Sequence, residues 1–186
     1  MGILAIIITV IGVTYAAFTD TGKVLGSTFS VGSADIKLLE DVTLGTESYN
    51  LVEELPGPNF DNISPFWVED YLLKIFNNSA NSVQISTTAN YETINDPEDL
   101  RQIIFVEPIE WDDINNDGIF EPLTETGNSL GKKTIVKWKT EGFDLGTFGS
   151  GAVKSMILRF STDEVSDTKQ GASAIFDFEF DSMEIH

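Results

Sequence analysis

Two runs of alternating apolar and polar residues constrain the fold of this chain more than any other feature. They are VKSMILRFS (153–161) and AIFDFEFD (174–181). Successive side chains of a β-strand point to opposite faces, so a period of two predicts a strand with one buried face. Each run turns three large apolar side chains towards a core: Met156, Leu158 and Phe160 in the first, and Phe176, Phe178 and Phe180 in the second. A change of parity before Met183 predicts a β-bulge near Ser182.

Other segments predict further strands. Residues 66–76 and 83–91 flank the turn-rich sequence NNSANS, and we expect them to form an antiparallel pair. Residues 103–109 and 134–139 show the same alternation and predict two more strands.

The connections are as informative as the strands. One short helix is predicted, with Asn95 or Asp96 as its cap and Pro97 in its first turn. The region 44–65, rich in Pro and Gly, is too broken for a central strand and predicts a connection that crosses between sheets. We therefore predict an all-β fold, a two-sheet antiparallel β-sandwich with one short helix in a crossover.

The composition is strongly acidic and lacks cysteine. Eleven Lys and Arg stand against 30 Asp and Glu, which gives a net charge of −19. Such a field repels nucleic acid and anionic membranes and attracts divalent cations. Without Cys, stability has to come from the core, a metal or partner contacts rather than from disulfides. The length of 17–186 suits a single domain.

An apolar run leads to the small residues Ala16 and Ala17. Signal peptidases need small side chains around the bond that they cut. The run therefore predicts a signal peptide over residues 1–16, with cleavage between Ala16 and Ala17. The alternative is a membrane anchor that is kept, because 2–18 approaches the length at which an apolar helix spans a bilayer.

The residues after the predicted cut resemble a known family. The chain continues A-F-x-D, and a T-F-x-x-G-x-x-D-I segment follows at 28–36. Both motifs are similar to the mature start of the TasA and camelysin family, whose signal peptides are removed by a dedicated SipW-type signal peptidase. The matching residues are Ala17, Phe18, Asp20, Thr28, Phe29, Gly32, Asp35 and Ile36. The resemblance implies a jelly-roll form of the sandwich and extracellular filaments or fibres of a biofilm matrix.

The strongest local motif is WDDINNDGIFE (111–121), which has the pattern of a Ca²⁺ loop. Oxygen ligands alternate along it, and Gly118 permits a sharp bend. An EF-hand proper is not expected, because position twelve holds Thr124 and Glu125 comes one residue late. The predicted Ca²⁺ ligands are Asp113, Asn115, Asp117, the carbonyl of Ile119, and Glu121. The alternative is a polar turn without metal.

No enzymatic site can be assembled from the sequence. The one histidine is His186 and there is no Cys, so neither a zinc helix nor a Ser-His-Asp or Cys-His set is possible. We therefore expect a protein that is not an enzyme. A metalloprotease activity has been attributed to camelysin-like members of the family, and this is the weakest alternative.

Two further sets of residues have alternative interpretations. Trp67, Trp111 and Trp138 could line a sugar-binding groove, but core packing is the favoured explanation. Asn62 and Asn77 match the glycan acceptor pattern, which is common by chance.

These features predict a secreted, non-enzymatic subunit that polymerises. A terminal strand released by proteolysis can pair with an open sheet edge of a neighbour, and residues 17–31 are the expected donor segment. Its apolar contacts would come from Phe18, Val24, Leu25 and Phe29. The partners are then other copies of the chain and the signal peptidase, with membrane contact only through residues 1–16 before cleavage. The alternative is a membrane-tethered, calcium-binding surface or adhesion domain.

Processing can be tested directly. Ala16→Leu should block maturation, because a large side chain does not fit the pocket before the scissile bond, whereas Ile6→Leu should not. Mass spectrometry of the exported proteins measures the outcome. Normal removal of residues 1–16 from the Ala16→Leu variant would show that the cleavage site is misassigned.

Overall fold

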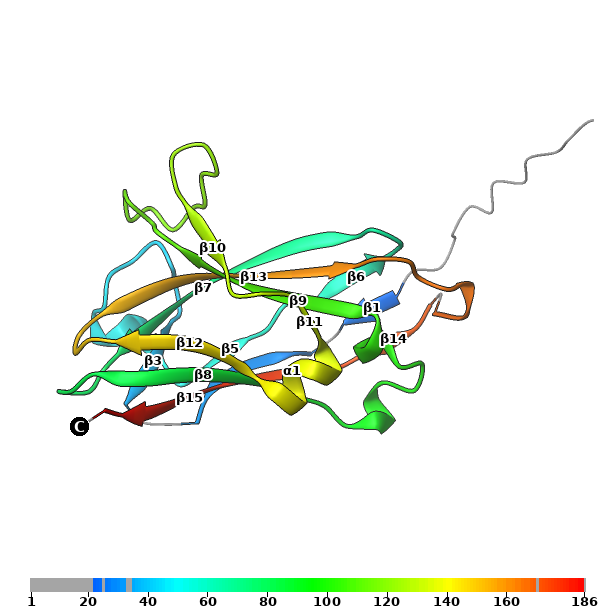
Figure 1. Ribbon diagram of the computed structural model, residues 1–186, viewed down its shortest axis with the longest axis horizontal. Helices are drawn as coiled ribbons and strands as arrows, with labels where there is room; N and C mark the ends of the chain where they lie inside the picture. The colour runs from blue at the N-terminus through cyan, green and yellow to red at the C-terminus, as the bar shows by residue number, and fades with distance from the viewer. Residues whose placement is uncertain (1–21, 25, 33–34, 170, 186) are drawn as a thin grey trace, which may run out of the picture.

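The computed structural model describes residues 22–24, 26–32, 35–169 and 171–185 (Figure 1). Within them two large sheets lie face to face and a small third sheet lies at one end. The predicted all-β, two-sheet sandwich is confirmed. No helix of the described residues is long and apolar enough to cross a membrane.

Each sheet combines segments that are far apart in the sequence. The seven-stranded sheet has the order β10, β9, β13, β7, β3, β4, with β11 also beside β9: β10 (Gly127–Ser129), β9 (Ile104–Trp111), β13 (Val153–Thr162), β7 (Val68–Asn77), β3 (Ile36–Leu39), β4 (Leu51–Val52) and β11 (Lys133–Thr134). The five-stranded sheet has the order β12, β8, β15, β2, β5: β12 (Phe143–Phe148), β8 (Val83–Asn90), β15 (Asp177–Glu184), β2 (Thr28–Val31) and β5 (Glu54–Pro56). The small sheet has the order β14, β1, β6: β14 (Ser173–Ala174), β1 (Gly22–Val24) and β6 (Phe60–Ile63).

The alternating runs fill the space between the two large sheets, as predicted. All six large side chains that they turn inward are buried. Phe178 of β15 lies at the centre of this core: its ring centroid is 5.1 Å from that of Phe29, 4.7 Å from Trp138 and 5.6 Å from Phe160. The predicted bulge near Ser182 is wrong, because β15 pairs with β8 in continuous register over its whole length.

Along its long strands, the chain alternates repeatedly between the two large sheets. β7, β9 and β13 belong to the seven-stranded sheet, whereas β8, β12 and β15 belong to the five-stranded sheet. This alternation is the jelly-roll-like feature of the sandwich. The predicted pairing of 66–76 with 83–91 is wrong: β7 pairs with β3 and β13, while β8 pairs with β12 and β15. Most pairs are antiparallel, but β2 runs parallel to β15.

The helix of the crossover lies at a different place from the one predicted. Residues 134–139, expected to form a strand, belong mainly to helix α1 (Ile135–Glu141). The Thr134 side chain accepts a hydrogen bond from the Lys137 N–H, and Gly142 ends the helix at φ +62°. Ile135 and Trp138, three residues apart on one helical face, are both fully buried. The helix connects β11 of one large sheet to β12 of the other.

The segment around Asp96 forms short 3₁₀ turns instead of an α-helix. The predicted cap at Asn95 or Asp96 is wrong, because the residue before the turn Leu100–Gln102 is Asp99. The Asp96 carboxylate nevertheless accepts hydrogen bonds from the N–H groups of Leu100 and Arg101 in this turn. Asp99 has φ +55°, which interrupts a regular helix. The four 3₁₀ helices of the described residues are η1 (Ser48–Asn50), η2 (Thr93–Asn95), η3 (Leu100–Gln102) and η4 (Asp167–Lys169).

The connection predicted over residues 44–65 is confirmed as a crossing between sheets. β4 and β5 lie at the edges of different large sheets, and Glu53 alone separates them. The Tyr71 hydroxyl of β7 donates to the Pro56 carbonyl of β5 over 2.9 Å and so joins the two layers. Burial raises the pKa of the Tyr71 phenol.

The central role of Phe178 can be tested against a neighbour on the same strand. Phe178→Ala removes a buried ring that contacts both sheets and α1, so it should lower the free energy of unfolding by about 3–5 kcal/mol. Met183 of β15 is 68% exposed, and Met183→Ala should change this free energy little. Chemical denaturation of the two variants measures the difference, and similar losses would contradict the assigned centre of the core.

Candidate functional site

Residues 112–126 form an arm that projects from the seven-stranded sheet between β9 and β10 (Figure 1). Antiparallel pairing of β10 with β9 closes its base. Ile109, Trp111 and Ile157 are buried in a second apolar cluster, with Leu72 and Phe120 packed against it. Phe120 belongs to the arm, so the arm covers part of the outer face of this sheet. That cover explains why Ile157 is buried although it points away from the main core.

Glu125 organises the arm from inside. Its carboxylate accepts hydrogen bonds from the Trp111 indole N–H over 2.6 Å, from the Ile114 N–H over 3.1 Å and from the Glu121 N–H over 3.0 Å. The residue is buried. One carboxylate therefore joins the end of β9 to both limbs of the loop.

A second buried carboxylate, that of Asp113, binds a lysine of the sheet beneath. The Nζ of Lys74 in β7 lies 2.5 Å from Oδ2 of Asp113, and the two side chains are 6% and 2% exposed. The Gly118 N–H donates to the same oxygen over 3.1 Å. The other oxygen, Oδ1, is buried and has no hydrogen-bond partner among the described residues.

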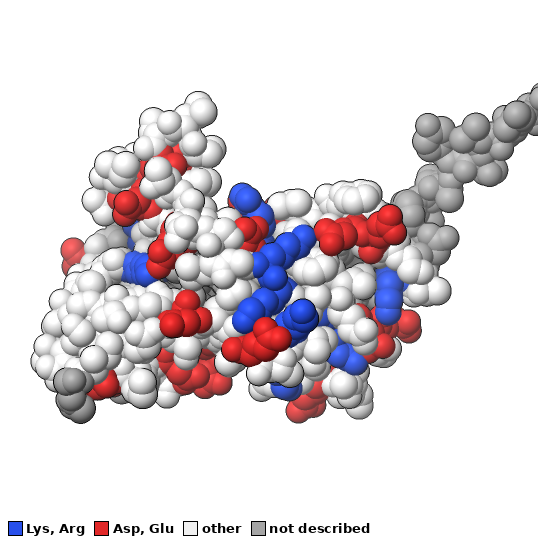
Figure 2. All heavy atoms as spheres, in the orientation of Figure 1, with Lys and Arg blue, Asp and Glu red and all other residues white. Residues whose placement is uncertain are grey.

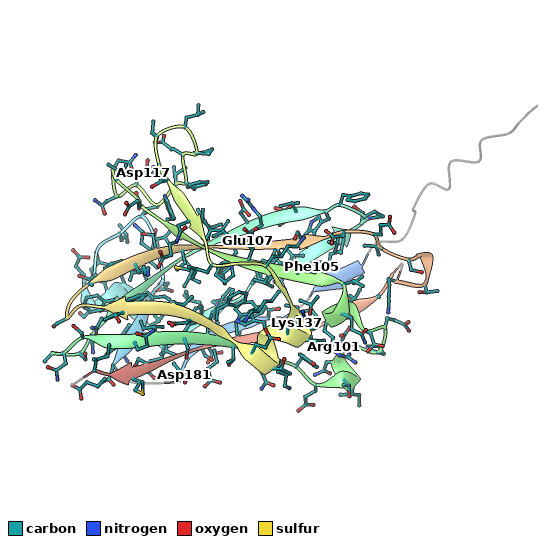
Figure 3. All side chains as sticks on the ribbon, in the orientation of Figure 1. Arg101, Phe105, Glu107, Asp117, Lys137 and Asp181 are labelled. Carbon is teal, nitrogen blue, oxygen red and sulfur yellow. The ribbon has the colours of Figure 1, made fainter. Side chains whose placement is uncertain are left out.

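The loop between these carboxylates is built from short side-chain turns. Asn115 Oδ1 accepts from the Asp117 N–H over 3.1 Å, and Asp117 Oδ1 accepts from the Ile119 N–H over 2.8 Å. Asp117 lies on the projecting arm (Figure 3). Gly118 has φ +72°, and a Cβ there would lie 2.8 Å from the backbone of Val42. Glycine is therefore required where the arm meets the turn at 41–46.

That facing turn is held by its own hydrogen bonds. Asp41 accepts from the Thr43 hydroxyl over 2.6 Å and from the Thr43 N–H over 2.8 Å. The hydroxyl first, and then the N–H, lower the pKa of the Asp41 carboxyl. Asn50 donates from its side chain to Asp41 and Gly45 carbonyls, which closes the turn.

The structure brings together part of the predicted calcium set. Asp113, Asn115 and Asp117 share one turn, whereas the Glu121 carboxylate accepts a hydrogen bond from the Thr124 hydroxyl. Ile119 contributes its N–H to the turn of Asp117. Among the residues that the structure describes, no three His, Cys, Asp or Glu side chains already converge as a metal site.

Sequence reasoning missed the two residues that matter most beside this set. Glu125 falls one position late for the closing ligand of an EF-hand, so the loop spacing predicts no role for it. Lys74 interrupts the apolar run of β7, LLKIF, and a charge inside such a strand is the signal that could have found it.

The N-terminal part of the described chain forms a second arrangement of interest. β1 lies between β14, to which it is parallel, and β6, to which it is antiparallel. Neither β14 nor β6 pairs with any other strand of the described chain. Among the described residues, β1 is therefore the strand that joins β14 and β6 into one sheet.

The predicted donor residues have different locations. Phe29 is fully buried in the core of its own domain, in a β2 that pairs with β15 and β5. The expected donor segment 17–31 thus includes a strand, β2, that lies inside the five-stranded sheet of its own chain, and the part of β2 in any exchange stays a prediction. Val24 belongs to β1. Ala16, Ala17, Phe18 and Leu25 lie outside the described residues, as does His186.

The remaining sequence-based candidates are structural. Trp111 and Trp138 are buried, and Trp67 packs edge-on against Phe60 at 4.8 Å, so core packing is confirmed for the tryptophans. Asn77 is fully buried, and its amide nitrogen lies 2.8–3.1 Å from three carbonyl oxygens. Asn77 thus shapes the turn after β7 and presents no amide to a glycan. The Asn62 backbone lies in β6.

No model of a known protein family matches the chain, and no curated protein matches it. The resemblance to the TasA and camelysin family therefore remains a prediction that rests on the two motifs of residues 17–36.

The role of Glu125 can be tested by amide hydrogen exchange, with EDTA present so that no metal ion contributes. Glu125→Gln keeps the size of the side chain but turns an NH₂ group towards N–H donors, at a cost of about 1–3 kcal/mol. Amides of residues 112–126 should then exchange with solvent faster, while those of β8 keep their protection. The exposed Glu121→Gln is the matched control and should leave the arm protected; equal exchange in both variants would show that Glu125 does not organise it.

Proposed function

We propose that the protein is a non-enzymatic structural subunit that polymerises into extracellular filaments by exchange of its N-terminal strand. The observation that carries this proposal is the place of β1, the central strand of a sheet whose other two members pair with no further strand among the described residues. A donated strand occupies this kind of position, because main-chain hydrogen bonds hold it from both sides.

The environment of β1 makes an exchange energetically plausible. Ile63 of β6 and Ala174 of β14 are buried, so the small sheet is continuous with the hydrophobic core. If β1 of one copy occupied the same position in a neighbour, each subunit would keep the contacts that it has alone. Exchange of identical elements costs little for this reason, and it links subunits without a new interface.

The remaining sequence features agree with this function. Removal of residues 1–16 would release the segment that precedes β1, including Phe18, to reach a neighbour. The net charge of −19 keeps a concentrated surface protein soluble and disfavours nucleic acid as a partner. The chain itself and a signal peptidase are then the partners that the function requires.

A second candidate is a calcium-binding surface or adhesion domain tethered to the membrane. The arm favours it, because its exposed apolar side chains suit contact with another molecule: Ile114, Ile119 and Leu123 are 67%, 59% and 98% exposed. This function needs no release or exchange of β1.

Strand exchange can be tested with cysteines, since the chain has none of its own. Lys23 of β1 is in register with Ser173 of β14. We expect a mixture of Lys23→Cys and Ser173→Cys proteins, assembled and then oxidised, to give disulfide-linked heterodimers, because each β1 lies beside the β14 of another copy. Non-reducing electrophoresis measures them.

The matched control uses a pair that stays within one chain. Gln84 of β8 and Thr147 of β12 are in register, and mixed Gln84→Cys and Thr147→Cys proteins should give only background dimer. Phe18→Asp should in addition prevent fibres while circular dichroism stays β-rich, because the charge would enter an apolar slot. Heterodimers no more abundant than in the control, together with wild-type fibres from Phe18→Asp, would refute the exchange and favour the tethered domain.

A further inference from the structure

We propose that the arm binds a divalent cation of the calcium type at Asp113, with Asp117 and Asn115 as the next ligands. The proposal is independent of strand exchange, because it concerns a different part of the molecule. It rests on an incompletely satisfied buried carboxylate, on the charge balance around it and on the chemistry of the loop.

The first observation is the oxygen of Asp113 that lacks a partner. Both donors to this carboxylate, Lys74 and Gly118, bind Oδ2. Oδ1 is buried without a hydrogen bond from any described residue, in a side chain that is only 2% exposed. A buried carboxylate is stable when its oxygens are hydrogen-bonded or coordinate a metal, so Oδ1 is free to act as the first ligand.

The second observation is a deficit of positive charge inside the base of the arm. Two carboxylates are buried here, those of Asp113 and Glu125, and Lys74 supplies one ammonium group. The three donors to Glu125 are a Trp111 indole N–H and two backbone N–H groups, all neutral. A bound cation would offset the second negative charge.

The loop offers further hard oxygen ligands close in sequence to Asp113. Oδ2 of Asp117 accepts from the Asn115 side-chain amide over 2.9 Å, a contact between two exposed groups that can rearrange. Oδ1 of Asn115 accepts one N–H and has a second lone pair. Carboxylate and amide oxygens in a flexible arrangement suit Ca²⁺ better than Mg²⁺, which demands a near-ideal octahedron.

A polar cavity gives a cation access to this place. It lies between the base of the arm and β13, and its lining includes three acidic residues, Asp112, Asp113 and Glu110, and two basic ones, Lys74 and Lys154. Lys154 is ion-paired with Glu110 and Lys74 with Asp113, so the Asp112 carboxylate is the one of the three without an ion pair to these lysines. Acidic side chains lie on the arm, whereas Lys and Arg gather near α1 on the same face (Figure 2). The local field at the arm therefore attracts cations.

Lys74 distinguishes this site from an ordinary calcium loop. Its ammonium group already neutralises Asp113, so the arm folds around an internal cation and a metal ion has to bind beside it. Like charges repel, and removal of the ammonium should strengthen metal binding. Lys74→Met keeps most of the length of the side chain, removes the charge and leaves Asp113 dependent on the ion.

Terbium and calcium are the probes. Trp111 is hydrogen-bonded to Glu125 at the loop, and its indole should sensitise the emission of a bound Tb³⁺ ion. Ca²⁺ should lower this emission by competing for the site, and Trp111→Phe should remove it. Asp117→Asn keeps an oxygen for the Ile119 N–H but loses a charge. This substitution should weaken Tb³⁺ binding at least roughly tenfold, which is the lower end of the range for substitutions around a metal site. Asp163→Asn, which removes an exposed carboxylate outside the arm, should bind as the wild type does.

Thermal unfolding gives the second measurement. Ca²⁺ should raise the melting temperature of the wild type, and more strongly that of Lys74→Met, because binding stabilises the folded state. Tb³⁺ emission and calcium stabilisation that are alike in wild type, Asp117→Asn and Asp163→Asn would indicate general attraction to an acidic surface and overturn the proposal. The absence of any calcium effect in both the wild type and Lys74→Met would do the same, and Lys74 would then be the only cation of the arm.

Discussion

Burial of the Phe178 ring is the interaction on which the rest of the structure depends. The ring stacks on Phe29 of the N-terminal strand β2 and on Trp138 of helix α1, and it contacts Phe160 of the opposite sheet. Three segments from across the chain are thereby held around one side chain of β15. Trp138 also donates its indole N–H to the Thr87 carbonyl over 3.1 Å, so the helix is fixed to the five-stranded sheet by a polar contact as well as by packing.

The arm is stabilised differently from the sandwich. Its apolar cluster is small, and two buried carboxylates and a buried lysine lie at its base. Buried polar groups of this kind give up favourable hydration, and they are retained where each finds partners of fixed geometry. Glu125 meets that condition with three donors, whereas Asp113 meets it on one oxygen only. The arm is thus a well-defined loop with one unsatisfied position.

Much of the sandwich could be predicted because strand alternation is a local property. The alternation alone predicts the buried face of β15, which carries Phe178 and Phe180 and continues the pattern that begins at Phe176. The choice of strand partners is not a local property. Residues 66–76 and 83–91 suggested a hairpin, but strands distant in the sequence lie beside each of them: β3 and β13 flank β7, and β12 and β15 flank β8. The strand predicted over 134–139 follows the alternation of Val136 and Trp138 with two lysines, whereas the buried pair Ile135 and Trp138 is three residues apart and fits only a helix. In the site, the loop spacing was visible, but the partner Lys74 comes from 39 residues away.

The two proposed sites lie in different parts of the sandwich, and this separation matters for how they could work together. β1 lies at one end, and the arm rises from the seven-stranded sheet towards the other end (Figure 1). Subunits joined through β1 would therefore leave the arm unobstructed, with its Leu123 side chain 98% exposed. An exposed apolar side chain is useful for contact only if it is held in place. The buried contacts of Glu125 and Asp113, completed by a cation at the free Oδ1, would provide that rigidity without involving the strand that links the subunits.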